Sequence, residues 1–412
     1  MSLRVIRNFI LILAFTVLVG GIGYNLGKRE VNVSWKNFKP QISVSNLMPP
    51  ATSSVDFSIF WDVWQRIEKN YIDKKALDPQ KMVWGAISGM VASLGDPYTV
   101  FLTPQQQKES KEELGGQFEG IGAQLGIKDK KIVVVAPLKD TPAEKAGIKA
   151  GDWIVKVDDK DTVSWTLPET VSRIRGPRGT KVVLTVVHEL QEQPVEIEIT
   201  RDTILVKSVE WEKKEGVAYS QKSFAYLKLS RFGDQTSAEW EKATGEIITS
   251  YQKGEVKSLI LDLRNNPGGY LAGAVYIAGE FLARGTLVVQ QEQASGIGES
   301  YSVDRQGKLL DIPMVILINK GSASASEIVA GALRDYNRAR LVGETSFGKG
   351  SIQEAQDLPG GAGLHITTAK WLLPKGEWIN GAGIKPDIEL AMDEKNPTAD
   401  PQLEKAIETL LK

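Results

Sequence analysis

The spacing of large apolar residues predicts two helices in the N-terminal part of the chain. From Trp61 to Tyr71 such residues recur at every third or fourth position, which places them on one face of a helix. A second helical run extends from Met82 to Leu94, and the sequence Gly-Asp-Pro ends it. We therefore expect an N-terminal helical region over residues 55–114.

Between residues 115 and 202 the pattern changes to short strands separated by glycine-rich turns. Runs rich in β-branched residues predict strands at 131–136, 181–188 and 195–200. Residues 167–174 have helical spacing, and a shorter helix is expected where proline opens and glycine closes the sequence TPAEKAG. This segment is therefore expected to form a compact, mainly β unit.

Residues 203–390 alternate between apolar strands and helices. The runs at 258–263 and 314–319 predict buried strands, and each is followed by a turn and a helix. Two successive strand–turn–helix units indicate a parallel α/β sheet, and ligands bind at the carboxyl ends of the strands in such sheets. The turns RNNPGG and NKGSASAS both fall at such ends, so both are candidate site segments.

The two ends of the chain have other patterns. Arg4 and Arg7 precede an apolar run of about 18 residues, which is near the lower limit for a membrane span. We interpret residues 1–30 as an uncleaved signal anchor, with a cleaved signal peptide as the alternative. Prolines indicate a linker over residues 31–54, and residues 391–412 are expected to form a C-terminal helical tail.

Composition narrows the chemistry that the chain can perform. Of its 412 residues, 42% are hydrophobic and 25% are charged, as in globular proteins. The net charge of −1 gives no reason to expect a nucleic acid partner. The absence of cysteine excludes disulfides, thiolate metal sites and cysteine nucleophiles. Because the only histidines are His188 and His365, a histidine-rich metal site is excluded as well.

The sequence TPAEKAGIKAGDWIVKV, at residues 141–157, resembles the signature of PDZ domains in the circularly permuted form found in bacterial proteases. PDZ domains capture a peptide tail by strand addition, and backbone amides receive its terminal carboxylate. The alternative is that the glycines near residue 120 only form a turn. The resemblance implies that the carboxylate is received at Gly120, Ile121, Gly122 and Ala123.

Three serines alternate with alanines in NKGSASASE, at residues 319–327. One interpretation is a helix cap, since Ser324 and Glu327 fit the capping-box pattern S-x-x-E. The other is a nucleophile, because a hydroxyl that precedes a helix lies in the positive field of the helix N-terminus. Lys349, among glycines downstream, could act as a base if a desolvated site keeps it neutral; a solvated loop lysine is its alternative.

Four ordered motifs, DLRNNPGG, NKGSASASEI, FGKGSIQ and GAGIKPDI, closely resemble the C-terminal processing (tail-specific) peptidases. These are Ser–Lys serine proteases with an embedded PDZ domain, and the resemblance covers roughly residues 57–390. It implies a multidomain α/β fold: a parallel-sheet protease core (crotonase/Clp-like) at 203–390, an inserted mainly β PDZ domain at 115–202, and N-terminal helices. It implies no cofactor and no metal.

The resemblance also assigns roles to individual residues. Ser324 matches the nucleophile, Lys349 the general base, and Gln353 a residue that orients or polarises this pair. The implied oxyanion hole is formed by Gly268, Gly269 and the amide of Ala325. Ser326 is the rival nucleophile. Arg175 matches an arginine that couples peptide binding to protease activation, and a solvated surface charge is its alternative reading.

Together these features predict an anchored serine endopeptidase that binds the C-terminal tails of protein substrates and cuts near them. By resemblance, its catalytic domain lies on the extracytoplasmic side, periplasmic or extracellular, of a membrane that residues 1–30 cross once. Exchange of the terminal helices would give a homodimer or larger homo-oligomer. One alternative is a proteolytically silent PDZ protein that binds tails. The other is an acyl-CoA enzyme of the crotonase type, against which the PDZ unit and the FGKG lysine argue.

Overall fold

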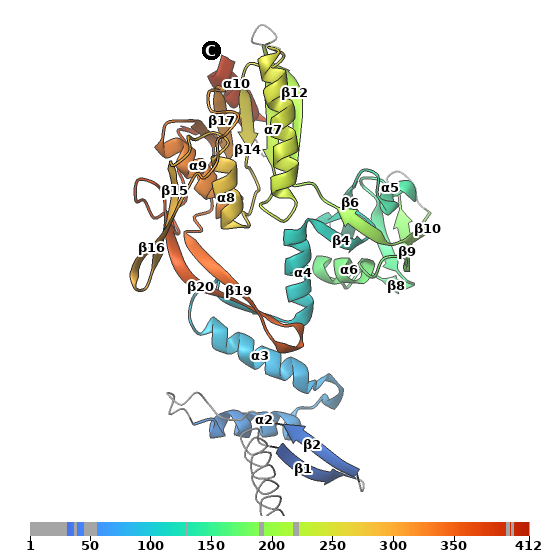
Figure 1. Cartoon of the computed structure of the whole chain (residues 1–412). Coiled ribbons are helices and arrows are strands. Elements are labelled where there is room, and N and C mark those ends of the chain that lie inside the picture. The colour runs from blue at the N-terminus through green and yellow to red at the C-terminus, as the bar shows by residue number, and fades with distance from the viewer. Residues whose placement is uncertain are drawn as a thin grey trace, which may run out of the picture. The chain divides into compact units, whose positions relative to one another are not determined.

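A computed structural model describes residues 31–36, 39–44, 56–128, 131–188, 193–216, 222–392, 396 and 399–411 (Figure 1). The chain forms two compact units, Met1–Met82 and Val83–Lys412. The signal anchor predicted at residues 1–30 lies outside the described residues. Within the described part of the chain, no helix has both the length and the apolar character that crossing a membrane requires.

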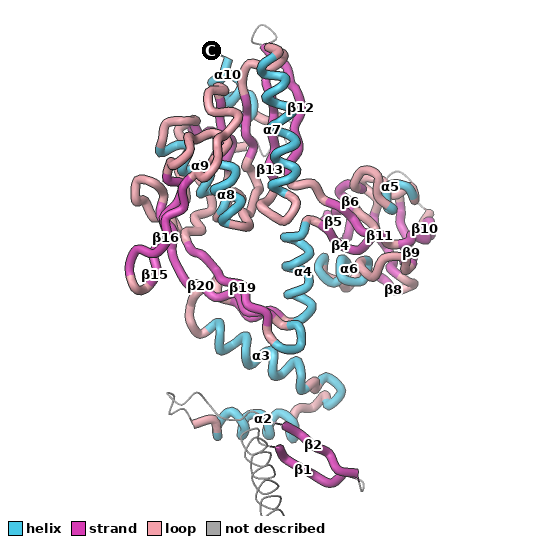
Figure 2. Tube along the Cα trace, viewed as in Figure 1, coloured by secondary structure: helices cyan, strands magenta, loops and turns pink. Residues whose placement is uncertain are grey.

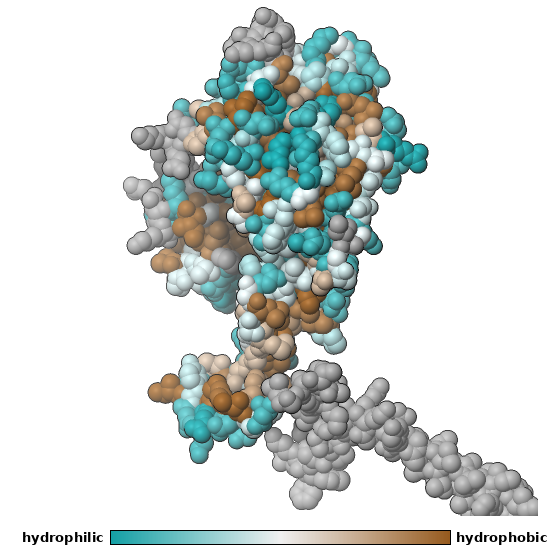
Figure 3. Space-filling model, turned by 90° about the vertical axis from the view of Figure 1, so that its left-hand side faces the viewer, coloured by the Kyte–Doolittle hydropathy of each residue, from teal (hydrophilic) through white to brown (hydrophobic). Residues whose placement is uncertain are grey.

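The first unit contains a hairpin and a helix. Strands β1 (Val31–Lys36) and β2 (Lys39–Val44) pair antiparallel in the segment that was predicted as a linker. Helix α2 (Ser58–Asn70) follows, with a single 3-10 turn, η1 (Lys74–Ala76), after it. All residues of α2 are described and none is buried. Its surface therefore carries both hydrophobic and hydrophilic residues (Figure 3), and the large apolar side chains that it exposes are Ile59, Trp61, Val63 and Ile67.

Helix α3 (Pro79–Ala92) leads into the second unit, where the short strand β3 (Val100–Leu102) and helix α4 (Pro104–Gly115) precede the PDZ segment. Thr103 and Gln106 form a capping box at the start of α4. This helix is strongly polar, and Gln107 is its one buried residue. The amide of Gln107 donates a hydrogen bond to Asp357 (2.8 Å), which ties α4 to a strand 250 residues further along the chain.

The PDZ segment is built around a sheet of strand order β10-β9-β7-β6-β5, with β8 paired to β7 and a separate pair, β11-β4. Its strands are β4 (Gln117–Gly120), β5 (Ala123–Lys128), β6 (Lys131–Pro137), β7 (Trp153–Val157), β8 (Lys160–Asp161), β9 (Lys181–Val187), β10 (Val195–Thr200) and β11 (Asp202–Leu205). Helices α5 (Pro142–Lys145) and α6 (Leu167–Ile174) occur where the sequence predicts them. Strand β5 lies at one end of the strand order, so one side of it is available for pairing.

The core sheet has the strand order β12-β13-β14-β17-β18-β21, parallel from β13 to β21. Its strands are β12 (Val209–Gly216), β13 (Lys222–Leu229), β14 (Leu259–Asp262), β17 (Met314–Ile318), β18 (Arg340–Gly343) and β21 (Ile388–Glu389). Strands β14 and β17 are buried along their whole length. Strands covered on both faces read as continuous apolar runs, which is why the sequence predicted them.

Helices cover both faces of this sheet, and successive strand residues alternate between them. Ile316 and Ile318 face the larger cluster, beneath α7 (Thr236–Gln252), α8 (Leu271–Ala278) and α9 (Ala325–Asp335). Val315 and Leu317 face the other cluster, which α10 (Pro401–Leu411) covers (Figure 1). The predicted multidomain α/β fold with a parallel core is confirmed.

A second sheet, of order β16-β15-β20-β19 with β3 paired to β20, was not predicted. Its main strands are β15 (Leu287–Gln293), β16 (Gly296–Ser302), β19 (Ser351–Asp357) and β20 (Gly363–Leu372). Figure 2 shows β19 and β20 running side by side, in agreement with their antiparallel register from Ser351–Lys370 to Asp357–Gly363. Strands β19 and β20 of this sheet carry residues that line the cavity of the candidate site.

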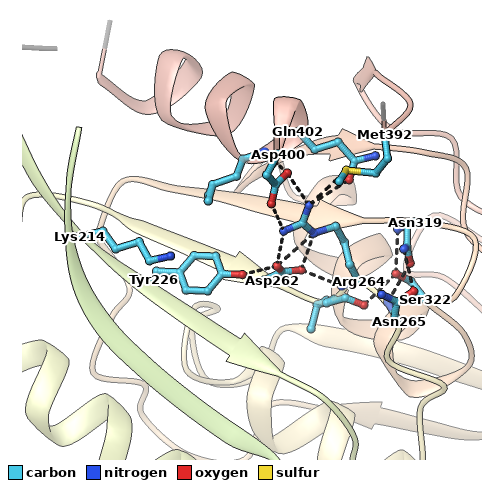
Figure 4. Close-up of polar contacts among 12 residues, drawn as sticks. Lys214, Tyr226, Asp262, Arg264, Asn265, Asn319, Ser322, Met392, Asp400 and Gln402 are labelled. Carbon is cyan, nitrogen blue, oxygen red and sulfur yellow. Dashed lines mark hydrogen bonds and ion pairs between the residues drawn. The ribbon is translucent and has the colours of Figure 1, made fainter. Parts of the chain in front are cut away.

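The C-terminal helix is fastened to the core sheet by a buried ion-pair cluster (Figure 4). The Arg264 guanidinium contacts Asp262 on one side (2.7 Å) and Asp400 on the other (2.8 Å to each oxygen). It also donates to Gln402 (3.2 Å), and Tyr226 donates to Asp262 (2.5 Å). Because Arg264 lies two residues after the end of β14 and is the first residue of the RNNPGG turn, this cluster fixes the start of that turn.

We predict that Arg264→Leu lowers the free energy of unfolding by about 3–5 kcal/mol, because it leaves the buried Asp262 carboxylate without its cation. Urea denaturation measures the change. The control is Arg178→Leu, which removes an ion pair with Asp202 of the same 2.8 Å distance whose side chains are 69% and 50% exposed. It should cost less than about 1 kcal/mol. Equal losses in the two variants would contradict the assignment of the cluster as a structural anchor.

Candidate active site

The RNNPGG and NKGSASAS turns lie side by side, because they follow the adjacent parallel strands β14 and β17. Asn265 donates its backbone N–H to the Asn319 side chain (2.8 Å), and the Asn319 amide donates back to the Asn265 side chain (2.9 Å). Ser322 donates its hydroxyl to the carbonyl of Leu263 (2.8 Å). The two turns are therefore held in one arrangement.

Ser324 has an unusual backbone conformation, with φ 56° and ψ −117°, at the residue before α9. A positive φ at a residue other than glycine costs roughly 1–3 kcal/mol, and such residues gather at functional sites. Hydrogen bonds to both the N–H and the carbonyl of Ser324 hold this strained conformation. The backbone N–H of Ser324 donates to the Glu327 carboxylate (2.7 Å), and the Ser324 carbonyl accepts from the N–H of Ile328 (2.9 Å).

Only one of the three serines can reach a substrate. The hydroxyls of Ser322 and Ser326 are fully buried and donate to backbone carbonyls, Ser326 to Asn266 (3.0 Å) and to Ala323 (2.8 Å). Ser324 is half-buried and lines a cavity of about 990 Å³. The geometry therefore favours Ser324 over its rival Ser326 as the nucleophile.

The fully buried Glu327 carboxylate joins the serine segment to the lysine segment. One of its oxygens accepts from the N–H groups of Ser324 (2.7 Å) and Lys349 (2.9 Å). The other accepts from the Ser346 hydroxyl (2.6 Å) and the N–H of Gly348 (2.6 Å). Among the described residues, two donors thus reach each oxygen of Glu327, and these four hydrogen bonds replace the water that the buried carboxylate loses.

Lys349 lines the same cavity as Ser324 and is partly buried. Burial lowers the pKa of Lys349, and the negative charges of Asp96 and Glu327 act in the opposite direction without reversing that shift. Its ammonium nitrogen lies 5.0 Å from the centre of the Tyr98 ring. A desolvated lysine of this kind can be the neutral base that the sequence interpretation requires.

Gln353 also lines the cavity. In this structure its amide donates to the hydroxyls of Ser351 (2.9 Å) and Thr367 (3.1 Å), so its assigned effect on the serine–lysine pair stays a prediction. His365 lies on the cavity wall as well, and burial together with the positive charge of Lys349 lowers the pKa of His365.

The predicted oxyanion-hole residues meet beside Ser324. A side chain at Gly268 (φ 97°) would come within 2.8 Å of the Ser324 Cβ and 3.0 Å of the Ala325 nitrogen, so only glycine allows this approach. The Gly268 N–H donates to the Asn266 side chain (2.9 Å), whereas Ala325 stands in the first turn of α9, where N–H groups have no partner within the helix. This favours the amide of Ala325 over that of Gly268 as a donor to an oxyanion.

The predicted peptide-binding loop has its carbonyl groups occupied. The Ile121 carbonyl accepts from the N–H of Ala143 (2.8 Å), and the Gly122 carbonyl from the N–H of Leu138 (2.8 Å). Gly122 has a positive φ of 78°, and a Cβ there would lie 2.4 Å from the Thr141 side chain. Gly120 ends β4, and Ala123 begins the edge strand β5. A loop with satisfied acceptors beside an open strand suits an incoming carboxylate.

Arg175 lines the cavity and lies near the start of this loop, since its Cγ would be 3.7 Å from a Cβ added at Gly120. It follows α6 directly, and its guanidinium lies 4.6 Å from the centre of the Phe118 ring and 3.6 Å from a carboxylate oxygen of Glu112 on α4. Arg175 and Ser324 line the same cavity, which also reaches Val171 on α6. Arg175 therefore lies where it can contact both the PDZ segment and the cavity that contains Ser324. Its regulatory role stays a prediction.

Two residues of the site carried no role in the sequence interpretation. Glu327 was noted only as part of a capping pattern, and Tyr98, which follows the Gly-Asp-Pro sequence at the end of the second helical run, was not singled out. The spacing of Glu327 from Ser324 was the available signal for the first. For Tyr98 the only signal was a turn rich in polar residues about 250 positions before Lys349.

Comparison with protein families matches the model "Peptidase family S41" to residues 223–390 and the model "PDZ domain" to residues 133–187. The model "Activating protease CtpB N-terminal domain" matches residues 28–106. The chain is 38% identical to "Carboxy-terminal processing protease CtpA" of Bacillus subtilis over 339 residues, 82% of this chain and 70% of that protein. It is 41% identical to "Probable CtpA-like serine protease" of Staphylococcus epidermidis, where the match spans only 64% of the relative's length and 80% of this chain.

Solved structures agree with this likeness. The structure named "Photosystem II D1 C-terminal processing protease" is similar at a TM-score of 0.51 and 29% identity, covering 86% of this chain and 97% of that one. A putative S41 protease from Bacteroides fragilis shares the fold, with a TM-score of 0.55 at 15% identity, covering 89% and 98%. The predicted family and the inserted PDZ domain are confirmed.

We predict that Glu327→Gln lowers the free energy of unfolding by about 2–4 kcal/mol. The amide group of glutamine would face two of the four donors, and each buried donor left unsatisfied costs about 1–3 kcal/mol. The control is Glu344→Gln, whose partner Lys320 is 84% exposed, and it should cost less than about 1 kcal/mol. If urea denaturation gives Glu327→Gln the same small cost, the carboxylate does not hold the two segments together.

Proposed function

Because the chain belongs to peptidase family S41, we propose that it is a serine endopeptidase that cuts proteins near their C-termini with a Ser–Lys dyad. One observation carries the proposal: Ser324 and Lys349 line the same cavity, and the Glu327 carboxylate accepts from the backbone N–H of both. The names of the relatives, carboxy-terminal processing and CtpA-like serine proteases, support the reaction class.

In the proposed mechanism, neutral Lys349 removes the proton from the Ser324 hydroxyl as its oxygen attacks a peptide carbonyl. The carbonyl oxygen becomes negative and accepts from backbone amides, such as those of Ala325 and Gly269, which commonly contribute about 10²–10³ in rate each. When the C–N bond breaks, Lys349 returns the proton to the leaving amine. Water, deprotonated by Lys349, then releases the acyl group from Ser324.

The proposed route for the substrate begins at the PDZ domain. A tail added beside β5 would place its carboxylate at residues 120–123. From α6 and Arg175 the cavity continues to Ser324, so a chain held by its end can extend toward the dyad. This would explain cutting near the C-terminus, because the distance from the tail to the cut is set by the protein.

The proposal extends to location and assembly. The basic and apolar pattern of residues 1–30 supports a single-pass anchor, and the family resemblance supports a catalytic domain on the extracytoplasmic side of the cell membrane. Self-association into a homodimer or larger homo-oligomer would cover the apolar side chains that α2 exposes.

We expect the protein to cleave an unfolded test protein with an apolar free C-terminus, and expect Ser324→Ala and Lys349→Ala to lose at least about 10³-fold in kcat/KM. Ser326→Ala, which removes the rival hydroxyl, should retain most of the activity. Activity should fall as the pH is lowered, since protonation of Lys349 removes the base. Equal cleavage by all variants would exclude this dyad. Binding without cleavage by the wild type would favour the silent PDZ tail-binding protein.

Tail capture can be measured by itself in the Ser324→Ala background, with a fluorescent peptide that ends in an apolar residue. Gly122→Ala should weaken binding about tenfold, because the added Cβ would strain the loop and clash with Thr141. Gly179→Ala is the control: its φ is also positive, +81°, but nothing lies within 4 Å of an added Cβ. The amidated peptide should bind weakly to every variant. Tight binding of the amidated peptide would contradict carboxylate recognition.

A further inference from the structure

The turn at residues 95–99, between α3 and β3, reaches the lysine of the dyad. It places the Tyr98 ring 5.0 Å from the Lys349 ammonium nitrogen, within the roughly 6 Å over which a cation and an aromatic face attract each other. The turn lies about 250 positions before Lys349 in the sequence and is outside the PDZ and protease segments that carry the family motifs. Tyr98 is partly buried, so the contact is shielded from water.

Hydrogen bonds fix this turn against the second sheet. The Asp96 carboxylate accepts from the N–H of Tyr98 (3.0 Å) and the hydroxyl of Thr99 (2.6 Å). The Thr99 hydroxyl accepts from the N–H of Thr367 on β20 (3.0 Å), and the Thr367 hydroxyl accepts from the Gln353 amide (3.1 Å). A continuous chain of hydrogen bonds therefore runs from Asp96 to Gln353, which lines the same cavity as Lys349.

We propose that Tyr98 and Asp96 are positioning residues for Lys349: the tyrosine ring seats the lysine ammonium, and the aspartate holds the turn and supplies a negative charge. This inference rests on the proposed function, in which Lys349 is the base. Neither residue touches the reacting carbonyl in this scheme. Both act on the protonated form that Lys349 takes when it receives the proton of Ser324.

In the described part of the chain, four titratable groups interact with Lys349. Asp96 and Glu327 are negative and favour its ammonium form, and the Tyr98 ring favours that form through its face. His365 stands on the cavity wall, and its pKa is lowered by burial and by Lys349, which favours a neutral imidazole. Burial opposes the two carboxylates, because it lowers the pKa of Lys349. Burial therefore disfavours the ammonium form of Lys349, and the turn partly offsets this effect through the charge of Asp96 and the ring of Tyr98.

This balance suits a base that must be neutral before the reaction and charged during it. Burial keeps Lys349 able to accept a proton, and Tyr98 with Asp96 stabilises the ammonium that forms as Ser324 attacks. Groups already in place when charge develops lower the barrier without reorganising. Loss of the Tyr98 ring or of the Asp96 charge should therefore make Lys349 easier to deprotonate and at the same time reduce the maximal rate.

The test measures the protonation of Lys349 directly, by the pH dependence of its acetylation with acetic anhydride, detected by mass spectrometry of the peptide that contains it. This readout does not depend on proteolysis. The variants are Tyr98→Leu, which removes the ring; Tyr98→Phe, which keeps it; and Asp96→Asn, which removes the charge in the same shape. Tyr336→Leu is the control, because Tyr336 is also a tyrosine next to an aspartate but lies exposed at the end of α9.

For Tyr98→Leu and Asp96→Asn the midpoint of acetylation should move to lower pH by about half to one unit. Tyr98→Phe and Tyr336→Leu should keep the wild-type midpoint. On the unfolded test protein, Tyr98→Leu should lose about 5- to 30-fold in kcat while its pH profile shifts in the same direction. A structural defect alone would lower kcat without moving the midpoint.

Unchanged midpoints in both Tyr98→Leu and Asp96→Asn would overturn the proposal, whatever the rates. A shift in Tyr98→Phe as large as in Tyr98→Leu would also overturn it, because the ring would then not be the cause. If the wild type cleaves nothing, the proposed function fails, and the acetylation midpoints still decide whether the turn seats Lys349.

Discussion

The buried carboxylate of Glu327 is the constraint on which the site depends. A carboxylate removed from water is costly unless hydrogen bonds replace its hydration, and here four donors do so. Two of them are the backbone N–H groups of Ser324 and Lys349. The same bonds that satisfy the charge therefore fix the segment of Ser324, the proposed nucleophile, to that of Lys349, the proposed base. The strained φ of Ser324 persists because the surrounding hydrogen bonds leave the backbone no relaxed alternative.

The parallel sheet brings these segments together in the first place. Strands β14, β17 and β18 are neighbours, so the turns that follow them share one edge of the sheet. The Arg264 cluster fixes the first turn from the side of α10, and the paired amides of Asn265 and Asn319 join it to the second. The proposed oxyanion donors and Ser324, the proposed nucleophile, are thus positioned by the core, before any substrate is present. Preorganisation of this kind is what makes such donors effective.

The sequence predicted the parts of this arrangement that local patterns encode. The apolar runs of β14 and β17 and the motifs around Ser324 and Lys349 lie within short windows, and all were found. The second sheet was missed because its strands, such as SIQEAQD at β19, are polar and lack a clear alternation; their pairing partners decide their structure. Glu327 was seen as a cap because its partners at residues 346–349 are about 20 positions away. Tyr98 was missed because its contact with Lys349 is brought about only by the folded chain.

A Ser–Lys site has to solve a problem that a histidine base largely avoids, since lysine is normally protonated at neutral pH. Burial favours the neutral form of Lys349, but it would also oppose the charge that forms in the proposed reaction. The structure sets two carboxylates and an aromatic ring against that burial, and the pKa of Lys349 is still lowered. One carboxylate, Glu327, belongs to the helix that presents Ser324; the other, Asp96, belongs to a distant turn. In the proposed mechanism, the protonation of Lys349 therefore depends both on the helix that begins after Ser324 and on the separate turn that carries Asp96.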